Sequence, residues 1–323
     1  MRCLPCGSPE VGSPRRPSCP WPSTPCSHAS ERGFERVAEP PSPVTDADFT
    51  RFCEFLYRRT GILFTPTKRY FVDRRLAERM YATGSRSFAV YLARLRSDTD
   101  GEVEHLINAF TINETYFYRE DHQLRCLTSS LLPKLVARKA PGSTVRIWSM
   151  PCSTGEEPYS VAMWLLENWP EVDRYDVEIV GSDIDTRALA AAEEGRYGER
   201  ALMRLSPELV VRYFEREEAR LGPAWRILAD LRGSVRFTPC NLTNAAAMAT
   251  QGRFDVVFCR NVLIYFDDAS RRLAADNIYD ALVPGGFVCL GHTESMSRIS
   301  PLFRVCRYDD AIVYRRPREG EHV

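Results

Sequence analysis

One turn with a single glycine joins a β-branched run to a helical pattern, and it is the first place where this sequence could do chemistry. The run Val145–Ser149 leads through Met150–Gly155 into a segment that opens with Glu156 and Glu157. A turn of this kind leaves backbone N–H groups free at the helix N-terminus, where they can bind a ligand. With one glycine it is neither the G-x-G-x-x-G of nicotinamide enzymes nor a P-loop. A nucleotide-like cofactor and an ordinary strand-to-helix turn both stay open.

Polar residues follow three further strand-like runs in the same half of the chain. Asp183 and Asp185 follow the second run, Asn241 the third, and Arg260 with Asn261 the fourth. The carboxyl ends of parallel strands meet at one edge of a sheet, so these side chains are expected to converge on one ligand. A carboxylate can accept from both ribose hydroxyls, which suits Asp183, whereas Asp185 suits a helix N-cap. Satisfying loop backbone is the alternative role for Asn241, Arg260 and Asn261.

Short β-branched runs alternate with helical patterns from residue 145 onward. This alternation predicts an α/β fold, in which a mostly parallel sheet is covered by helices on both faces and ligands bind at the carboxyl ends of the strands. The segment 303–315 predicts a terminal hairpin. The expected strands cover 145–149, 177–181, 235–237, 254–258 and 287–290, and the expected helices cover 156–167, 186–194 and 269–282.

A small all-helical domain is predicted for residues 44–112. Thr45 and Asp48 form a capping-box pattern ahead of apolar residues at helical spacing, and Gly61 marks the end of this first helix. Apolar residues within 72–84, 88–95 and 103–110 predict three more helices. A linking helix at 124–138 then leads into the α/β part of the chain.

Basic residues are concentrated in the predicted helical domain, although the chain as a whole has 43 Lys and Arg against 43 Asp and Glu. Segment 51–96 alone has 11 basic and 3 acidic residues. The neutral total excludes a whole-molecule attraction to nucleic acid or an anionic membrane, so a polyanionic partner has to meet a local patch. A solvated helix face and a docking surface for an acidic partner both stay open. The densest basic residues are Lys68, Arg69, Arg74, Arg75 and Arg79.

The first 43 residues hold 10 of the 22 prolines, a composition typical of a disordered tail. Their Cys3, Cys6, Cys19, Cys26 and His28 lack a second close pair of ligands, so no zinc site is expected there. The other cysteines are scattered through apolar segments, which indicates buried thiols in a reducing compartment rather than disulfides. No apolar run is long enough for a membrane helix or signal peptide, so we expect a cytoplasmic protein.

The chain resembles the CheR family of chemoreceptor glutamate O-methyltransferases. Five stretches carry this resemblance in the family's order: FTINETYFYRE at 110–120, IWSMPCSTGEEPYSVAM at 147–163, GSDIDT at 181–186, FDVVFCRNVLIYF at 254–266 and GHTESM at 291–296. The resemblance implies a Rossmann-like S-adenosylmethionine-dependent methyltransferase domain at 113–318, with a small β-subdomain near 214–236 and a short tail at 319–323. It also implies methyl transfer to glutamate side chains of chemoreceptors, with S-adenosylhomocysteine as the second product.

The resemblance assigns roles to residues of these stretches and their surroundings. Arg119 and Tyr265 are expected beside the transferred methyl group, Asp183 at the ribose, and Asn241 with Leu242 beside the adenosine. A salt bridge to Glu120 or Asp121 is the alternative role of Arg119. The full set of expected cofactor contacts is Asn113, Thr115, Arg119, Glu157, Asp183, Asn241, Leu242, Arg260 and Asn261.

Methyl transfer to a carboxylate suits what the sequence offers. A glutamate carboxyl, with an ordinary pKa near 4.3, is ionised at cell pH, so its attack on a sulfonium methyl group needs no general base. None is evident, because the 5 His are widely separated and no Ser-His-Asp or metal-ligand group occurs. The guanidinium fork of Arg119 is suited to holding the attacking carboxylate.

The expected partner is the cytoplasmic helical region of a methyl-accepting chemoreceptor, whose glutamates complement the basic helical segment. We expect a monomer without metal, membrane insertion or nucleic-acid partner, and the Asn/Asp-Pro-Pro-Tyr signature of amine-methylating nucleic-acid enzymes is absent. The few glycines near 214–236 disfavour the clasping of a receptor tether peptide. The alternative function is a cofactor-binding but non-catalytic signalling protein of the same fold.

Overall fold

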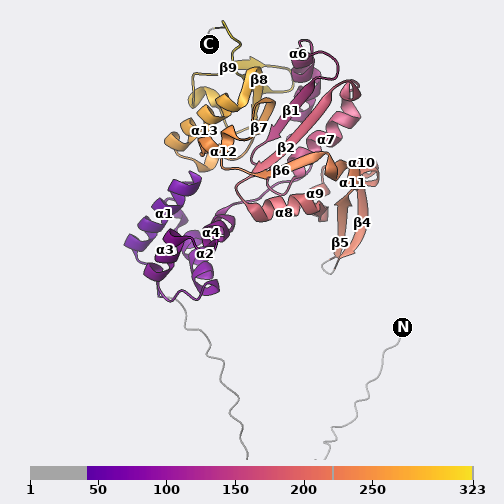
Figure 1. The fold of residues 1–323 in the computed structure, drawn as a ribbon. Coiled ribbons are helices and arrows are strands. Elements are labelled where there is room, and N and C mark those ends of the chain that lie inside the picture. Colours follow the sequence, from indigo (N-terminus) through magenta and orange to yellow (C-terminus); the bar gives the residue numbers. More distant parts are fainter. Residues whose placement is uncertain (1–41, 220–221, 322–323) are drawn as a thin grey trace, which may run out of the picture. The chain divides into compact units, whose positions relative to one another are not determined.

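The computed structural model describes residues 42–219 and 222–321 of the 323-residue chain, and Figure 1 shows their arrangement. The cysteines and histidine considered for zinc, and nearly all of the predicted tail, lie outside these ranges. Every cysteine within the ranges is a free thiol. No helix in this described part combines the length and the apolar character needed to cross a membrane.

Helices α1 to α4 form the N-terminal domain. They comprise α1 (Asp46–Thr60), α2 (Arg69–Ala82), α3 (Phe88–Ser97) and α4 (Glu102–Phe110), with the 3-10 turn η1 (Pro66–Lys68) before α2. The predicted capping box is present, because Thr45 and Asp48 accept each other's backbone N–H groups through their side chains. Gly61 ends α1 with a φ of 74°, a left-handed conformation that glycine adopts without strain. The four predicted helices are confirmed.

The core of this domain contains one buried ion pair among apolar side chains. Glu102 is 3% exposed and accepts hydrogen bonds from Arg79 at 2.9 and 2.5 Å and from the Tyr91 hydroxyl at 2.7 Å. A buried carboxylate has to be paired, and loss of its partner is strongly destabilising. Arg79 therefore stabilises the interior of the domain, so its predicted docking role would cost this ion pair.

A helical segment links the two domains. It consists of α5 (His122–Cys126), a π-helical turn η2 (Leu127–Leu131) and α6 (Leu132–Val136). Its apolar residues, Leu124, Leu127 and Leu131 among them, are buried in the core of the second domain. The helix predicted at 124–138 is confirmed, while its π turn had no sequence signal.

A seven-stranded sheet of order β6-β2-β1-β7-β8-β10-β9 forms the centre of the second domain. The pairings from β6 to β8 are parallel, and those of β8 with β10 and of β10 with β9 are antiparallel. This confirms the predicted mostly parallel sheet with a terminal hairpin. The strands are β1 (Thr144–Ser149), β2 (Asp176–Asp183), β6 (Val235–Pro239), β7 (Phe254–Cys259), β8 (Leu282–Leu290), β9 (Arg304–Arg307) and β10 (Ile312–Arg315).

Apolar layers cover the sheet on both faces, because successive side chains of a strand point to opposite sides. Ile147 of β1 packs in the layer of α7 (Glu156–Asn168) and the linking helix, whereas its neighbour Trp148 packs in the layer of α13 (Asp268–Ala281). Helix α8 (Thr186–Glu194) follows β2, and α12 (Ala245–Ala249) follows β6. The three predicted helices of this domain are confirmed.

A second, three-stranded antiparallel sheet has the order β3-β5-β4, and Figure 1 shows its strands β4 and β5 side by side. Its strands are β3 (Arg196–Tyr197), β4 (Phe214–Ala219) and β5 (Gly222–Ile227), flanked by short helices α9 (Glu199–Leu202), α10 (Pro207–Tyr213) and α11 (Ala229–Gly233). The boundaries of this subdomain therefore differ at both ends from those expected, near 214–236. Its third strand comes from 196–197, and residues from Val235 onward belong to the main sheet.

Candidate active site

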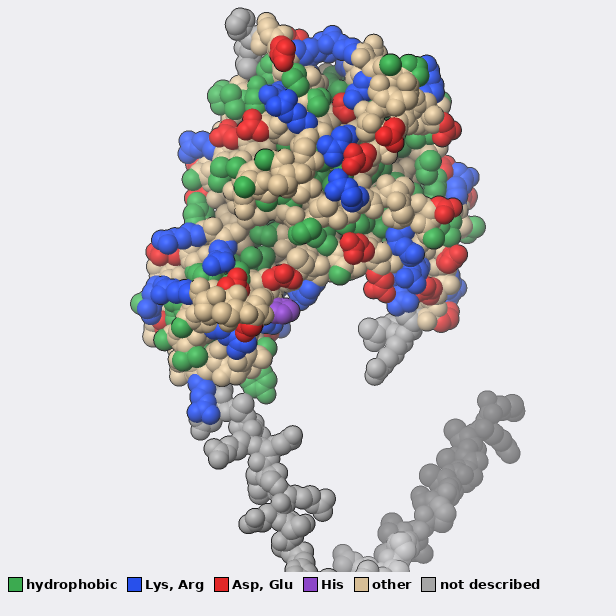
Figure 2. Space-filling model, viewed as in Figure 1, with side chains coloured by type: hydrophobic (Ala, Val, Ile, Leu, Met, Phe, Trp, Pro, Cys, Tyr) green, Lys and Arg blue, Asp and Glu red, His purple; other side chains and the backbone are tan. Residues whose placement is uncertain are grey.

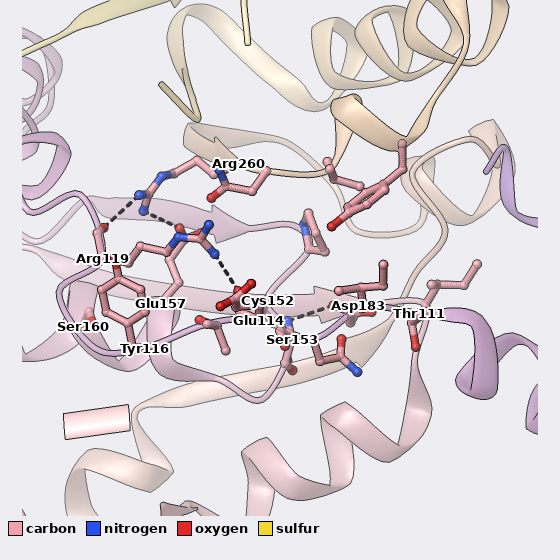
Figure 3. A pocket seen from close by; sticks show the side chains of 18 of the residues that line it. Thr111, Glu114, Tyr116, Arg119, Cys152, Ser153, Glu157, Ser160, Asp183 and Arg260 are labelled. Carbon is pink, nitrogen blue, oxygen red and sulfur yellow. Dashed lines mark hydrogen bonds and ion pairs between the residues drawn. The ribbon is translucent and has the colours of Figure 1, made fainter. Parts of the chain in front are cut away.

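A cleft opens where the carboxyl ends of β1, β2 and β7 meet the segment that follows α4 (Figure 3). The strand register brings these ends together, since Ser149 lies opposite Gly181 of β2 and Phe258 of β7. Its empty space, including the part open to solvent, is about 870 Å³. Of the predicted site residues, the cleft is lined by Asn113, Thr115, Arg119, Glu157, Asp183, Arg260, Asn261 and Tyr265.

Hydrogen bonds and one close approach fix the turn after β1, while the Ser153 hydroxyl has no hydrogen-bond partner among the described residues. The Ser153 N–H donates to Asp183 at 2.8 Å, and the Tyr197 hydroxyl donates to the Thr154 carbonyl at 2.8 Å. Gly155 has a φ of 92°, and a Cβ there would lie 2.8 Å from the Cβ of Ala192, so the close approach of α8 requires glycine. The buried Ser153 hydroxyl is therefore available to a ligand in the cleft.

Asp183 ends β2 inside the cleft, and its environment favours the protonated carboxyl. Burial raises the pKa of Asp183 to about 6, although hydrogen bonds from the backbone N–H groups of Asp185 and Ser153 oppose the rise. The neighbouring Asp185 caps α8 by accepting from the N–H groups of Arg187 and Ala188 at 2.9 and 3.1 Å. The predicted capping role of Asp185 is confirmed.

The segment after α4 lines the cleft and is held by Asp185. Asn113 donates from Nδ2 to Asp185 at 2.8 Å, and the hydroxyl of Thr111 donates to the same oxygen. Further along, Arg119 donates from Nη1 to the Glu114 carbonyl at 2.5 Å, and its guanidinium lies 5.7 Å from the centre of the Tyr116 ring. These contacts fold Arg119 over the cleft (Figure 3).

The alternative salt bridge of Arg119 is not formed, because other cations hold both acids. Glu120 lies 3.1 Å from Arg260 and 2.8 Å from the imidazole of His292, and Asp121 accepts from Arg125 at 2.8 Å. Burial raises the pKa of Glu120, but the charge of Arg260 and hydrogen bonds from His292 and Arg260 reverse this, so the net pKa is lowered. Glu120 therefore stays ionised as a partner of Arg260.

Arg260 is the buried centre of an ion-pair network at the end of β7. Its side chain donates to Glu157 at 2.6 Å and to the backbone carbonyl of Arg119 at 2.8 Å, and the residue is 6% exposed. Glu157 also accepts from the Ser149 hydroxyl at 2.7 Å. The network joins β1, α7, β7 and the segment that carries Arg119, so it fixes the position of the cleft walls.

Glu294 supports this region, although no sequence pattern assigned it a specific role. One of its carboxylate oxygens accepts from the N–H groups of Val262 and Leu263, and the other from those of Asn261 and Gly291, all at 2.8 to 3.0 Å. Asn261 has a φ of 59°, a strained conformation that these bonds hold. The only sequence signal of Glu294 was its place in the GHTESM stretch.

Tyr265 belongs to the 3-10 turn η4 (Leu263–Tyr265), which follows the loop bound by Glu294. Its side chain lines the cleft together with Arg119, Asn261 and Val262. Burial raises the pKa of Tyr265, and the nearby Arg119 offsets this only in part. The phenol therefore keeps its proton at neutral pH.

Asn241 and Leu242 do not line the cleft. Asn241 donates from Nδ2 to the Arg59 carbonyl at 2.7 Å and accepts from the Thr243 N–H at 2.9 Å. Leu242 is buried, and its carbonyl accepts from Asn277 at 2.8 Å. In this structure Asn241 binds the end of α1 to the loop after β6, the backbone-satisfying role that was its alternative.

The predicted docking residues have different surroundings. Arg69 pairs with Asp46 and Asp73 at 2.8 and 2.6 Å, and Arg75 donates to the Ala109 carbonyl while lying 4.3 Å from the centre of the Phe71 ring. Lys68 and Arg74 are exposed, and Arg74 is 3.0 Å from Glu78. On the face that Figure 2 shows, basic and acidic side chains of the helical domain are intermixed. Only Lys68 and Arg74 are available for docking without loss of a buried contact.

No group of three or more His, Cys, Asp or Glu in the described ranges is placed to hold a metal ion. The cleft thus offers a buried acid, a hydroxyl without a partner in the described part of the chain, an arginine fork and a phenol. These groups suit an organic ligand with hydroxyl and charged ends.

Comparisons with known proteins agree with this assignment of domains and cleft. Residues 47–111 match the family model "CheR methyltransferase, all-alpha domain", and residues 113–312 match "CheR methyltransferase, SAM binding domain". Similar proteins named chemotaxis protein methyltransferase occur in several bacteria. Chemotaxis protein methyltransferase 2 of Vibrio cholerae is 47% identical over 279 residues, which cover 86% of this chain and 96% of that protein. Those of Klebsiella aerogenes and Escherichia coli are 39% and 35% identical, over 80% and 87% of this chain and 86% and 94% of theirs.

Both matched models lie in sequence order, and the second contains every residue that lines the cleft from Asn113 to Tyr265. The Vibrio cholerae and Escherichia coli relatives match over almost their whole length, so the likeness is not confined to a cofactor-binding fold. The chain belongs to the CheR family of S-adenosylmethionine-dependent methyltransferases.

Proposed function

We propose that this protein transfers the methyl group of S-adenosylmethionine to glutamate side chains of chemoreceptors, giving glutamate methyl esters and S-adenosylhomocysteine. The observation that carries the proposal is one cleft in the matched methyltransferase domain, lined by Arg119, Asp183 and Tyr265. A carboxylate nucleophile needs no general base, and the groups around this cleft are suited to holding charge rather than removing protons.

The residues present fit S-adenosylmethionine. The unpartnered hydroxyl of Ser153 and the carboxyl of Asp183 face one end of the cleft, where ribose hydroxyls can donate and accept. Asn113 and Thr115 also line the cleft, where their polar groups suit the amino-acid end of the cofactor. Glu157 is already bonded to Arg260 and Ser149, so it supports the cleft wall and has limited capacity for a further contact.

When bound, S-adenosylmethionine supplies a methyl group activated by a positively charged sulfur. Arg119 is placed to grip the incoming carboxylate with its remaining N–H groups, because only Nη1 is bonded to the Glu114 carbonyl. Tyr265 keeps its proton and donates a hydrogen bond beside the reacting carboxylate, which orients the carboxylate and excludes water. Holding two reactants in attack geometry lowers a barrier by up to roughly 7 to 11 kcal/mol, so positioning alone accounts for much of the catalysis.

The proposed partner is the cytoplasmic helical region of a methyl-accepting chemoreceptor, and the protein acts on it as a cytoplasmic monomer without a metal. The exposed Lys68 and Arg74 support an acidic partner through charge complementarity. Nucleic acid is not a partner in this proposal, since the described basic residues are interspersed with acids.

Incubation with methyl-labelled S-adenosylmethionine and a receptor cytoplasmic fragment tests the proposal. We expect label that mild base releases as methanol, because carboxyl methyl esters hydrolyse readily whereas methylated amides and amines do not. Label that resists base overturns the glutamate assignment. Binding of S-adenosylhomocysteine in calorimetry without any transfer to receptor fragments favours the non-catalytic signalling protein instead.

A further inference from the structure

An apolar cavity adjoins the cleft on the side of the helical domain. This cavity, here called the side groove, is lined by Leu63, Phe64, Phe71, Phe110, Ile112 and Tyr265, and its empty space, including the part open to solvent, is about 550 Å³. Its aromatic rings hold one another in place, since the Phe64 centroid lies 5.8 Å from that of Phe71 and 5.6 Å from that of Phe110. The floor is therefore preformed and rigid.

Two large apolar side chains at the rim of the side groove are open to solvent. Leu63 is 47% exposed and Ile112 is 50% exposed, whereas Phe110 beneath them is buried. Single exposed apolar residues are common, but a pair of them above an apolar cavity with a buried floor is typical of a binding groove. The rim also contains one cation, the exposed Lys68.

The side groove is continuous with the cleft. Ile62, Ile112 and Tyr265 line both cavities, so one row of side chains separates the reacting centre from the groove. The Leu63 N–H donates to the Tyr265 carbonyl at 3.2 Å, and Ile62 forms an antiparallel bridge with Phe266. The groove is thereby held in a fixed position relative to Tyr265.

We infer, resting on the proposed function, that the side groove binds an apolar side chain of the substrate helix located one helical turn from the methylated glutamate. Side chains three or four residues apart on a helix are neighbours about 5 to 6 Å apart. This spacing allows two such side chains to enter two cavities that a single row of side chains separates. A helix that places its glutamate in the cleft therefore presents its next side chain on that face to the groove. Lys68 at the rim pairs with an acidic side chain of the same helix.

Matched receptor fragments test this inference with the full-length protein. Each helical fragment carries one methylatable glutamate, with leucine or serine four residues before it or four residues after it. We expect the leucine fragment to be preferred over its serine match by about tenfold in kcat/KM for one of the two placements. Equal kcat/KM values for all four fragments overturn the inference.

Enzyme variants locate the preference. Leu63→Gln changes an exposed rim residue that lines only the side groove among the cavities described, and it should abolish the preference for leucine. Val90→Gln is the matched control, because Val90 is an exposed apolar residue of α3 (57% exposed) away from the groove, and it should retain the preference. An undiminished preference in Leu63→Gln contradicts the inference.

Two further readouts separate the remaining explanations. If wild-type protein binds S-adenosylhomocysteine but methylates no fragment, the proposed function fails, which is distinct from methylation without a leucine preference. If Leu63→Gln changes the sedimentation coefficient and leaves kcat/KM unchanged for every fragment, the groove is covered by a second copy of the chain, and the inference is wrong.

Discussion

Arg260 donates a hydrogen bond from Nη1 to Oε2 of Glu157 at 2.6 Å, which joins the end of β7 to the first turn of α7 beneath the cleft. Two carboxylates, Glu157 and Glu120, contact this one guanidinium. Arg260 is buried, so its charge is stable there only while both carboxylates are present. The position of the cleft walls depends on this network.

Replacing Arg260 with methionine should destabilise the protein strongly. Arg260→Met keeps an unbranched apolar stem but leaves Glu157 and Glu120 without their arginine, and breaking a buried pair on one side costs about 3 to 5 kcal/mol. The free energy of unfolding in urea measures the loss, with Arg74→Met as the control, since Arg74 is exposed. A loss no larger than that of the control contradicts the structural role of this ion-pair network.

Glu294→Gln should lower turnover more than it raises KM. The carboxylate accepts four backbone N–H groups, whereas a glutamine side chain has one acceptor oxygen, so some donors around Asn261 lose their partner at about 1 to 3 kcal/mol each. The loop that carries Tyr265 then shifts, and we expect kcat to fall on the order of tenfold to a hundredfold. Urea unfolding and steady-state kinetics measure both effects.

Glu294 acts through the loop, so it is a positioning residue, and Tyr265→Phe provides the comparison. The double variant should lose little more kcat than the more affected single variant, because both changes disturb the same position. Independent, fully additive losses would show that Glu294 does not act by placing Tyr265.

Local patterns predicted most of the architecture, because periodicity and capping act within one element. The capping box at Thr45 and the strand that ends at Ser149 were both readable from neighbouring residues. By contrast, β3 has two residues, too few for any period, and it exists because Tyr197 pairs with Trp225 of β5. Strand pairing between distant segments is not encoded in a local pattern.

Contacts between distant residues explain what the site prediction lacked. Glu294 meets Val262 32 residues away, and Arg79 meets Glu102 23 residues away. A charged residue looks the same in sequence whether it faces solvent or a buried partner, so Arg79 was grouped with exposed cations. Asn241 followed a strand as required, yet its amide turned to the Arg59 carbonyl of the helical domain.

Arg119→Ala should reduce kcat by about a hundredfold or more while changing the Kd of S-adenosylhomocysteine by less than about threefold. The expectation follows from a fork that holds the attacking carboxylate, an interaction that is worth most in the transition state. Arg200→Ala is the control, because Arg200 is exposed and pairs with the side chain of the same Glu114 whose carbonyl accepts from Arg119. Equal losses in turnover and affinity would assign Arg119 to cofactor binding alone.

Charge reversal at Lys68 and Arg74 should raise KM for receptor fragments severalfold and weaken its dependence on salt. Both side chains are exposed, so the change acts on the encounter with an acidic helix rather than on folding. The control is Arg96→Glu, at an exposed position near the end of α3. Reversal of Arg79 should instead unfold the helical domain, because Glu102 is buried against it. An unchanged KM in the Lys68→Glu, Arg74→Glu protein contradicts a docking role.

Cofactor affinity should depend on pH through Asp183, whose pKa in the folded protein is about 6 against an ordinary 3.8. The raised value means that the folded protein binds this proton more tightly than the unfolded chain, so the contribution of Asp183 to stability falls as pH rises from about 4 to 6. Cofactor affinity follows the opposite trend and rises with pH, because the ribose hydroxyls donate to the ionised carboxylate. We expect the Kd of S-adenosylhomocysteine to be about tenfold higher at pH 5 than at pH 7.5.

Calorimetry at both pH values measures the change. The control is Asp183→Asn, which keeps an acceptor for the Ser153 N–H but has no charge to lose, so it should bind weakly and equally at both pH values. A wild-type Kd that is independent of pH would remove the ionised Asp183 carboxylate from the ribose site.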